Sequence, residues 1–185
     1  MKAAFALLWL SLALILWGCS DEGISSPSEE ERRMNYQLGE FSAEHRRNGE
    51  LRWKVKGEAA VFFKNETAQI VKPTLVIFKD GEKAAVVTGE RGMVDQRSKD
   101  VQILGKVVGI SEEGRFYAEE VYWDDSNGEL YAPGKVKVVK GRSVLWGEEM
   151  RADPNLRHIR LKKITFKVRS EDEKHREELP DVQID

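Results

Sequence analysis

The sequence has a single cysteine, Cys19, in 185 residues, which excludes an intramolecular disulfide. Its three histidines, His45, His158 and His175, lie too far apart in the sequence to match a metal-ligand motif. Neither a G-x-S-x-G sequence nor a phosphate-binding P-loop is present. The chain therefore lacks the sequence marks of a disulfide scaffold, a metal or cofactor site, a serine hydrolase and a nucleotide-binding protein.

Positive charge is not in excess. The 30 Lys and Arg residues are balanced by 32 Asp and Glu residues, which gives a formal charge of −2. Because nucleic-acid-binding domains normally present a basic face, this balance argues against DNA or RNA as a partner. Hydrophobic residues make up 41% of the chain and charged residues 34%, so we expect one domain with a packed core and a strongly solvated surface.

The longest apolar run is also short. Residues 3–17 read AAFALLWLSLALILW and follow one basic residue, Lys2. A bilayer span needs about 20 apolar residues, whereas the hydrophobic region of a signal peptide has about 7–15. We therefore interpret residues 1–18 as a signal peptide or signal anchor.

The sequence L-W-G-C that follows resembles a bacterial lipoprotein signal, in which the cysteine is lipidated and becomes the mature N-terminus. Cys19 is then the expected lipid anchor. The alternative is an uncleaved signal anchor that extends through Cys19, since Trp17 is bulky for a processing site. Both interpretations predict a domain outside the cytoplasm that is anchored to a membrane. Residues 19–33 are mostly polar, so we expect the lipidated cysteine and a solvated tether there.

Most of the remaining chain alternates apolar and polar residues with a period of two, which is typical of strands with one buried face. Leu51, Trp53 and Val55 alternate with basic residues, for example. The Asn48-Gly49 sequence predicts a tight hairpin that pairs residues 34–43 with residues 51–63. The alternation changes parity at Lys162-Lys163, which predicts a β-bulge.

Turn sequences recur along the chain, and no long segment has a helical period. The pattern predicts an all-β domain at residues 34–169, of sandwich, jelly-roll or barrel type. Residues 170–185 are rich in charge, and we expect them to form a disordered tail.

An internal repeat supports this fold class. Residues 88–107 align with residues 146–164 at a constant offset of 58, which pairs Gly89 with Gly147 and Asp95 with Asp153. Each unit contains a strand, a Gly-Glu pair, a second strand, an Asp-centred turn and an alternating strand. Repeated units of this kind stack to share a core.

Two sets of residues are weak candidates for chemistry. The acidic pairs Glu119-Glu120 and Asp124-Asp125 are of the type that can act as acid and base. They flank a predicted hairpin turn, however, and we predict no catalytic residue. Trp53, Trp123 and Trp146 are either a sugar-stacking platform or, more simply, side chains packed in a core or groove.

Four stretches of the sequence resemble the LptC family, the membrane-anchored periplasmic component of the lipopolysaccharide export machine. They are GELRWKVKGEAA at 49–60, GE…D…VQILGKV at 89–107, GRFYAEEVYWDD at 114–125 and APGKVKV at 132–138. The resemblance covers residues 34–168 and also extends to the related OstA-like domain of a soluble bridge protein. It implies an open β-jelly roll of two antiparallel sheets built from related repeats.

The resemblance also implies a function without catalysis. An incompletely closed β-fold offers an apolar groove for the acyl chains of lipopolysaccharide. Groove candidates are the apolar residues on the expected inner faces: Trp53, Val55, Ile103, Val107, Val136, Val138, Trp146, Ile159 and Leu161.

The partners implied are subunits of an inner-membrane ABC transporter, which supply the energy, and the soluble periplasmic OstA-like bridge protein. The bridge protein is expected to add a strand to an open edge, at residues 34–43 or 159–168. The competing hypothesis is a structural envelope lipoprotein that binds proteins or glycan and carries no lipid.

Overall fold

The computed structural model describes residues 34–168, which form eleven antiparallel β-strands. Their bounds are β1 Met34–Arg47, β2 Glu50–Phe63, β3 Thr67–Val71, β4 Thr74–Lys79, β5 Glu82–Thr88, β6 Arg91–Asp95, β7 Val101–Ile110, β8 Arg115–Asp124, β9 Glu129–Lys140, β10 Ser143–Ala152 and β11 Ile159–Val168. The predicted signal or anchor segment, Cys19, the tether and the charged tail all lie outside the described residues. Within residues 34–168, no helix is long and apolar enough to cross a membrane.

All eleven strands belong to one hydrogen-bonded sheet. The long strand β2 pairs with β4 near its start and with β3 near its end, and β7 pairs in the same way with β6 and then β5. Consequently β3 and β4 are one strand interrupted at Lys72-Pro73, and β5 and β6 are one strand interrupted at Gly89-Glu90. With these two interruptions set aside, the strands follow one another in chain order as a simple meander.

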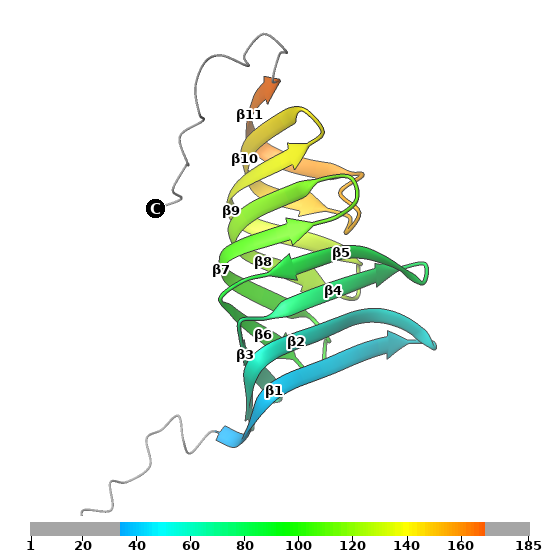
Figure 1. Cartoon of the computed structure of the whole chain (residues 1–185), viewed down its shortest axis with the longest axis vertical. Coiled ribbons are helices and arrows are strands. Elements are labelled where there is room, and N and C mark those ends of the chain that lie inside the picture. Colours follow the sequence, from blue (N-terminus) through cyan, green and yellow to red (C-terminus); the bar gives the residue numbers. More distant parts are fainter. Residues whose placement is uncertain (1–33, 169–185) are drawn as a thin grey trace, which may run out of the picture. The chain divides into compact units, whose positions relative to one another are not determined.

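The interruptions mark a corner at which the sheet folds onto itself (Figure 1). Other strands bend there through residues with positive φ, such as Lys106 in β7 and Glu149 in β10. The corner divides the sheet into two layers, which we name by their loops. Layer one carries the hairpins at 48–49, 80–81, 111–114 and 141–142, and layer two carries the turns at 64–66, 96–100, 125–128 and 153–158. The two antiparallel sheets expected from the sequence are thus the halves of one folded ladder.

Two local predictions are confirmed. The Asn48-Gly49 hairpin pairs β1 with β2 over almost their whole length. Between β10 and β11 the register advances by two residues on β10 while it advances by three on β11, from Lys162 to Thr165. Lys163 has a φ of 49°, so the extra residue of the bulge lies where the sequence changes parity.

The 58-residue repeat has a structural counterpart at the corner. A Cβ added to Gly89 would lie 2.5 Å from Ile103 and 3.0 Å from the carbonyl oxygen of Leu104. At Gly147 the equivalent neighbours are Leu161, at 3.2 Å, and the carbonyl oxygen of Lys162, at 2.8 Å. Both pairs of neighbours keep the offset of 58. Glycine is needed at these positions because the next strand crosses too close for a side chain.

The turn aspartates of the two repeat units, Asp95 and Asp153, also have the same structural role. Asp95 Oδ1 accepts hydrogen bonds from the backbone N–H groups of Arg97 and Ser98, at 2.7 and 3.1 Å. Asp153 Oδ1 accepts them from Arg157 and His158, at 2.8 and 3.2 Å. Each carboxylate therefore closes the layer-two turn that leads into the next strand.

These turns predict an acid-sensitive contribution to stability. The N–H groups of Arg97 and Ser98 lower the pKa of Asp95. Partial burial raises the pKa of Asp153, but the hydrogen bonds from His158 and Arg157 outweigh it and the net pKa is lowered. A carboxyl with a lowered folded-state pKa stabilises the fold above its unfolded pKa, and this contribution is lost as the pH falls through the folded pKa.

We therefore expect Asp95→Asn and Asp153→Asn to unfold more easily than the wild type at neutral pH and to lose less further stability in acid. The measurement is the urea midpoint of each protein from about pH 7 to about pH 3. Identical pH slopes for the wild type and both variants would show that the turn carboxylates do not carry this effect.

Candidate functional site

The space between the two layers is the main candidate site, and it is filled with apolar side chains. Six of the nine groove candidates have exposed fractions of only 0–3%: Trp53, Val55, Ile103, Val107, Val136 and Val138. Ile159 and Leu161 of β11 are half-buried against the same cluster. The structure therefore brings eight of the nine candidates to one interior.

Trp146 was predicted to face inward, and this facing was wrong. It lies opposite Lys137 of β9 and Thr165 of β11, whereas its neighbour Leu145 lies opposite the buried Val138. Leu145 packs against the interior cluster in its place. Trp146 is half-buried on the outer face of layer one.

The apolar interior reaches both edges of the sheet. Within residues 34–168, β1 pairs only with β2 and β11 pairs only with β10. Tyr36 and Leu38 of β1 lie in register with the buried Phe62 and Ala60, but they are 51% and 43% exposed because no further strand covers them. The edges thus combine unpaired backbone with inner-face apolar side chains, an arrangement that favours addition of another strand.

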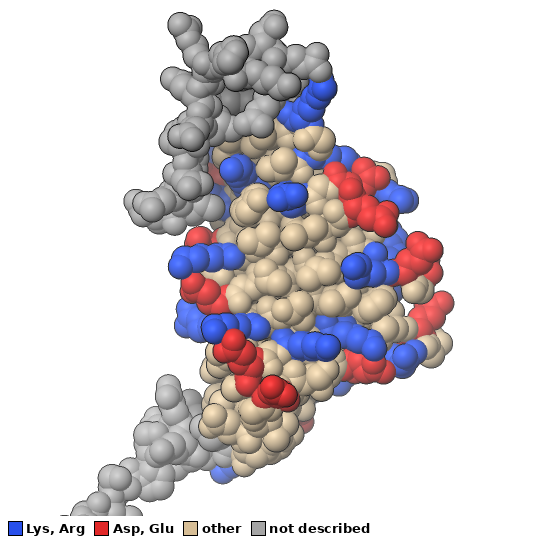
Figure 2. All heavy atoms as spheres, in the orientation of Figure 1, with Lys and Arg blue, Asp and Glu red and all other residues tan. Residues whose placement is uncertain are grey.

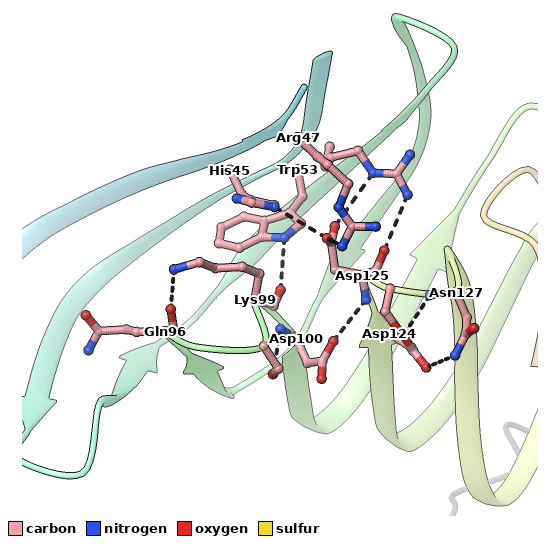
Figure 3. Close-up of polar contacts among 12 residues, drawn as sticks. His45, Arg47, Trp53, Gln96, Lys99, Asp100, Asp124, Asp125 and Asn127 are labelled. Atoms are coloured by element: carbon pink, nitrogen blue, oxygen red, sulfur yellow. Dashed lines mark hydrogen bonds and ion pairs between the residues drawn. The ribbon is translucent and has the colours of Figure 1, made fainter. Parts of the chain in front are cut away.

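The free rims of the two layers, opposite the corner, meet at two places. At the first, the Trp53 indole N–H donates to the carbonyl oxygen of Lys99 at 3.0 Å, and Arg47 donates to Asp125 at 2.6 Å (Figure 3). At the second, the 153–158 turn contacts layer one: the Ser111 hydroxyl donates to the carbonyl oxygen of Asn155 at 3.0 Å, and the Lys140 ammonium donates to that of Leu156 at 3.1 Å. The interior is therefore shut along part of the side that an open jelly roll would leave accessible.

The acidic pairs have separate structural roles. Asp124 caps its own turn by accepting hydrogen bonds from Asn127 and Ser126, and Asp125 is buried between the rims. On the outer face of layer two, the Glu120 carboxylate accepts hydrogen bonds from the side chains of Gln102 and Tyr122. The hydrogen bond from the Tyr122 hydroxyl to Glu120 raises the pKa of Tyr122 to about 12. In the part of the chain that the structure describes, no three His, Cys, Asp or Glu residues are placed to hold a metal ion.

The outer face of layer one is unexpectedly apolar at its centre. Figure 2 shows this face with charged side chains gathered mainly toward its margins. The outward positions of β4, β5, β7, β8, β9 and β10 are half-buried or exposed and include Val76, Val86, Val108, Ile110, Tyr117, Val139, Val144 and Trp146. Sequence alternation alone does not separate this face from the interior, because both faces of these strands carry apolar residues.

Comparison with known proteins identifies the family. Residues 3–169 match the model of the family described as lipopolysaccharide-assembly, LptC-related. The chain belongs to this LptC-related family. Family membership confirms the resemblance drawn from the sequence, and the family description connects the chain with lipopolysaccharide assembly.

A solved structure supports the fold of this LptC-related chain. This chain is similar to the crystal structure of LptH, the LptA homologous periplasmic component of the conserved lipopolysaccharide transport device from Pseudomonas aeruginosa. The TM-score is 0.53 and the sequence identity is 12%. The match covers 64% of this chain and 95% of that chain. At this identity the likeness shows the fold, so the jelly-roll prediction is confirmed. No curated protein matches the sequence at a significant level.

Proposed function

We propose that this LptC-related protein is a periplasmic lipopolysaccharide-binding component, which receives lipid from an inner-membrane ABC transporter and passes it to a soluble β-jelly-roll bridge. The observation that carries the proposal is the apolar interior, which runs from edge strand β1 to edge strand β11. No covalent step is required, because the task is to take up and release a lipid. The N-terminal region holds the domain at the inner membrane, through a lipidated Cys19 or an uncleaved signal anchor.

The physical argument rests on the acyl chains. Each CH₂ group kept out of water contributes about 0.8 kcal/mol, so several acyl chains cannot cross an aqueous compartment without an apolar path. The inner faces supply that path, from Trp53 and Val55 in β2 to Val136 and Val138 in β9. The sugar and phosphate headgroup would stay in water, beside the charged outer margins of the domain. Jelly rolls joined through β1 and β11 would extend the path from one protein to the next.

Site-specific photo-crosslinking tests the proposal. A small diazirine amino acid at Ile103 or Val136, both at most 3% exposed on the inner face, is expected to capture lipopolysaccharide in cells. Gln102 and Lys137 are the matched controls, since each is the sequence neighbour of a test position but faces outward, and they should capture little. The intact mass of the same protein reports whether residues 1–18 are removed and Cys19 carries acyl chains.

The alternative function is a structural lipoprotein that binds envelope proteins and carries no lipid. The apolar outer face of layer one, with Tyr117 and Trp146, is the observation that favours it. Crosslinks from the outer positions to proteins, together with no lipid at Ile103 or Val136, would support this alternative. Equal lipid labelling of both faces would rule out the interior as the lipid site.

A further inference from the structure

Asp125 is the one fully buried charged side chain within residues 35–165, with an exposed fraction of 0%. It lies in layer two, in the turn between β8 and β9, where its backbone N–H donates to the Asp100 carboxylate at 3.0 Å. A buried carboxylate is costly unless cations and hydrogen bonds compensate it. The residues that contact Asp125 therefore show how its buried charge is compensated.

All the basic side chains that contact Asp125 come from the opposite layer. Arg47 donates to Oδ2 at 2.6 Å, His45 Nε2 lies 3.4 Å from the same oxygen, and Arg52 Nε lies 3.7 Å from Oδ1. Arg52 also donates to the Asp125 carbonyl oxygen at 3.4 Å. These three residues flank the 48–49 hairpin. Arg47, for example, lies 78 positions before Asp125 in the sequence. We name the four side chains the Asp125 latch, because they join the free rims of the two layers (Figure 3).

The latch is ionic but incompletely hydrogen-bonded. Asp125 Oδ1, His45 Nε2 and Arg52 Nε are buried and have no hydrogen-bond partner. Only Arg47 makes a short bond to the carboxylate, and its side chain is 41% exposed. When an ion pair of this kind separates, its charges regain hydration, which offsets much of the lost attraction. A contact of this kind can open at a lower net free-energy cost than an apolar contact between the layers of similar area.

The latch lies directly over the interior. The His45 ring is 5.6 Å from the ring of Trp53, which is 3% exposed and bonded to the carbonyl oxygen of Lys99 in layer two. Trp53 and Val55 are covered in this closed form, so acyl chains that enter from the rim side reach them only after the rims separate. The position of the latch makes it the barrier at this point of the interior.

We propose that the Asp125 latch is the gate of the interior, and that it opens to admit acyl chains beside Trp53 and closes when the interior is empty. This inference rests on the proposed lipid-binding function. It assigns to His45, Arg47, Arg52 and Asp125 a role in controlling access, since they hold the layers together without forming the apolar path itself.

Hydrogen exchange of the full chain without lipid tests the gate. Asp125→Asn keeps the shape of the side chain but removes its charge, and Arg47→Gln changes a partly exposed partner in case the buried variant misfolds. Both are expected to speed amide exchange about tenfold in the 96–100 and 124–128 turns, but not around the separate Ser111–Asn155 contact. Glu129→Gln is the control, because Glu129 pairs with Arg151 and Arg160 and takes no part in the latch. Unchanged exchange in both folded latch variants would overturn the proposal.

Lipid uptake tests the role of the gate. An Arg47→Cys/Asp125→Cys double variant, in which Cys19 is replaced by serine, is compared before and after bridging with a short bis-maleimide, using fluorophore-labelled lipopolysaccharide as the probe. The unbridged variant should load faster than the wild type, and the bridged variant about tenfold more slowly than the same protein unbridged. Equal loading before and after bridging would show that lipid does not pass the latch. Failure of the wild type to bind the probe would instead refute the proposed function, while the exchange measurement still reports on the latch.

Discussion

A proline in edge strand β11 is expected to abolish binding of a neighbouring jelly roll while the domain itself stays folded. Strand addition uses backbone N–H and C=O groups, and proline removes a donor and fixes φ. Within the described residues β11 has one free side, because it pairs only with β10, where Thr165 lies opposite Trp146 and Lys167 opposite Val144. Binding of the purified soluble bridge protein and the β signal in circular dichroism are the two measurements.

Neighbouring positions supply the controls. Successive N–H groups of a strand point to opposite sides, so Thr165→Pro and Lys167→Pro remove donors on one side and Phe166→Pro removes one on the other. The substitutions on the outward side should eliminate binding, whereas those on the β10 side should weaken the fold. Lys167→Ala keeps the backbone donor and should bind nearly normally. Folded proline variants on both sides that still bind at wild-type strength would move the docking strand to β1.

Much of this fold can be predicted from the sequence, because its determinants are local. The alternation of Trp53 and Val55 with basic residues reports the buried face of β2, and Asn48-Gly49 fixes the hairpin that precedes it. The parity change at Lys162-Lys163 marks a bulge that the register confirms. Each of these signals lies within a few residues of the feature that it predicts.

The facing of β10 shows where such local signals end. Residues 144–146 read Val-Leu-Trp, an unbroken apolar run, since the outer face of layer one is apolar as well. With both faces apolar, alternation does not indicate which side is buried, and the prediction for Trp146 was wrong for that reason. The register with Val138 shows that Leu145 is the inward residue.

The Asp125 latch was missed for a different reason. Asp124 and Asp125 both suit a turn by composition, and their neighbours in sequence do not reveal that one of them is buried. The basic side chains that contact Asp125 lie on β1 and β2, and they reach it only because the corner folds layer one over layer two. A contact that depends on the closed sheet leaves no pattern within a short window of sequence.

The second large effect concerns packing inside the interior, at Gly109 of β7. This residue lies directly opposite Phe116 of β8, and a Cβ added there would be 2.1 Å from the phenyl ring. The ring is enclosed in the core, because Phe116 is 0% exposed. Gly109→Ala is therefore expected to destabilise the domain by about 1–3 kcal/mol, the range for overpacking a core. Gly134→Ala is the control, since no atom lies within 4 Å of its added Cβ.

A double-mutant cycle shows whether the phenyl ring is the cause. Phe116→Ala alone should cost about 3–5 kcal/mol, because it leaves a cavity between the layers. In that background Gly109→Ala should cost almost nothing, since the atoms it strikes are gone, so the coupling energy should be about 1–3 kcal/mol. Urea unfolding of the four proteins measures it. Additive costs would mean that the alanine is resisted by the β7 backbone rather than by Phe116. Coupling would show instead that the adjacent strands β7 and β8 are matched by size at this cross-strand pair, a small residue beside a large one.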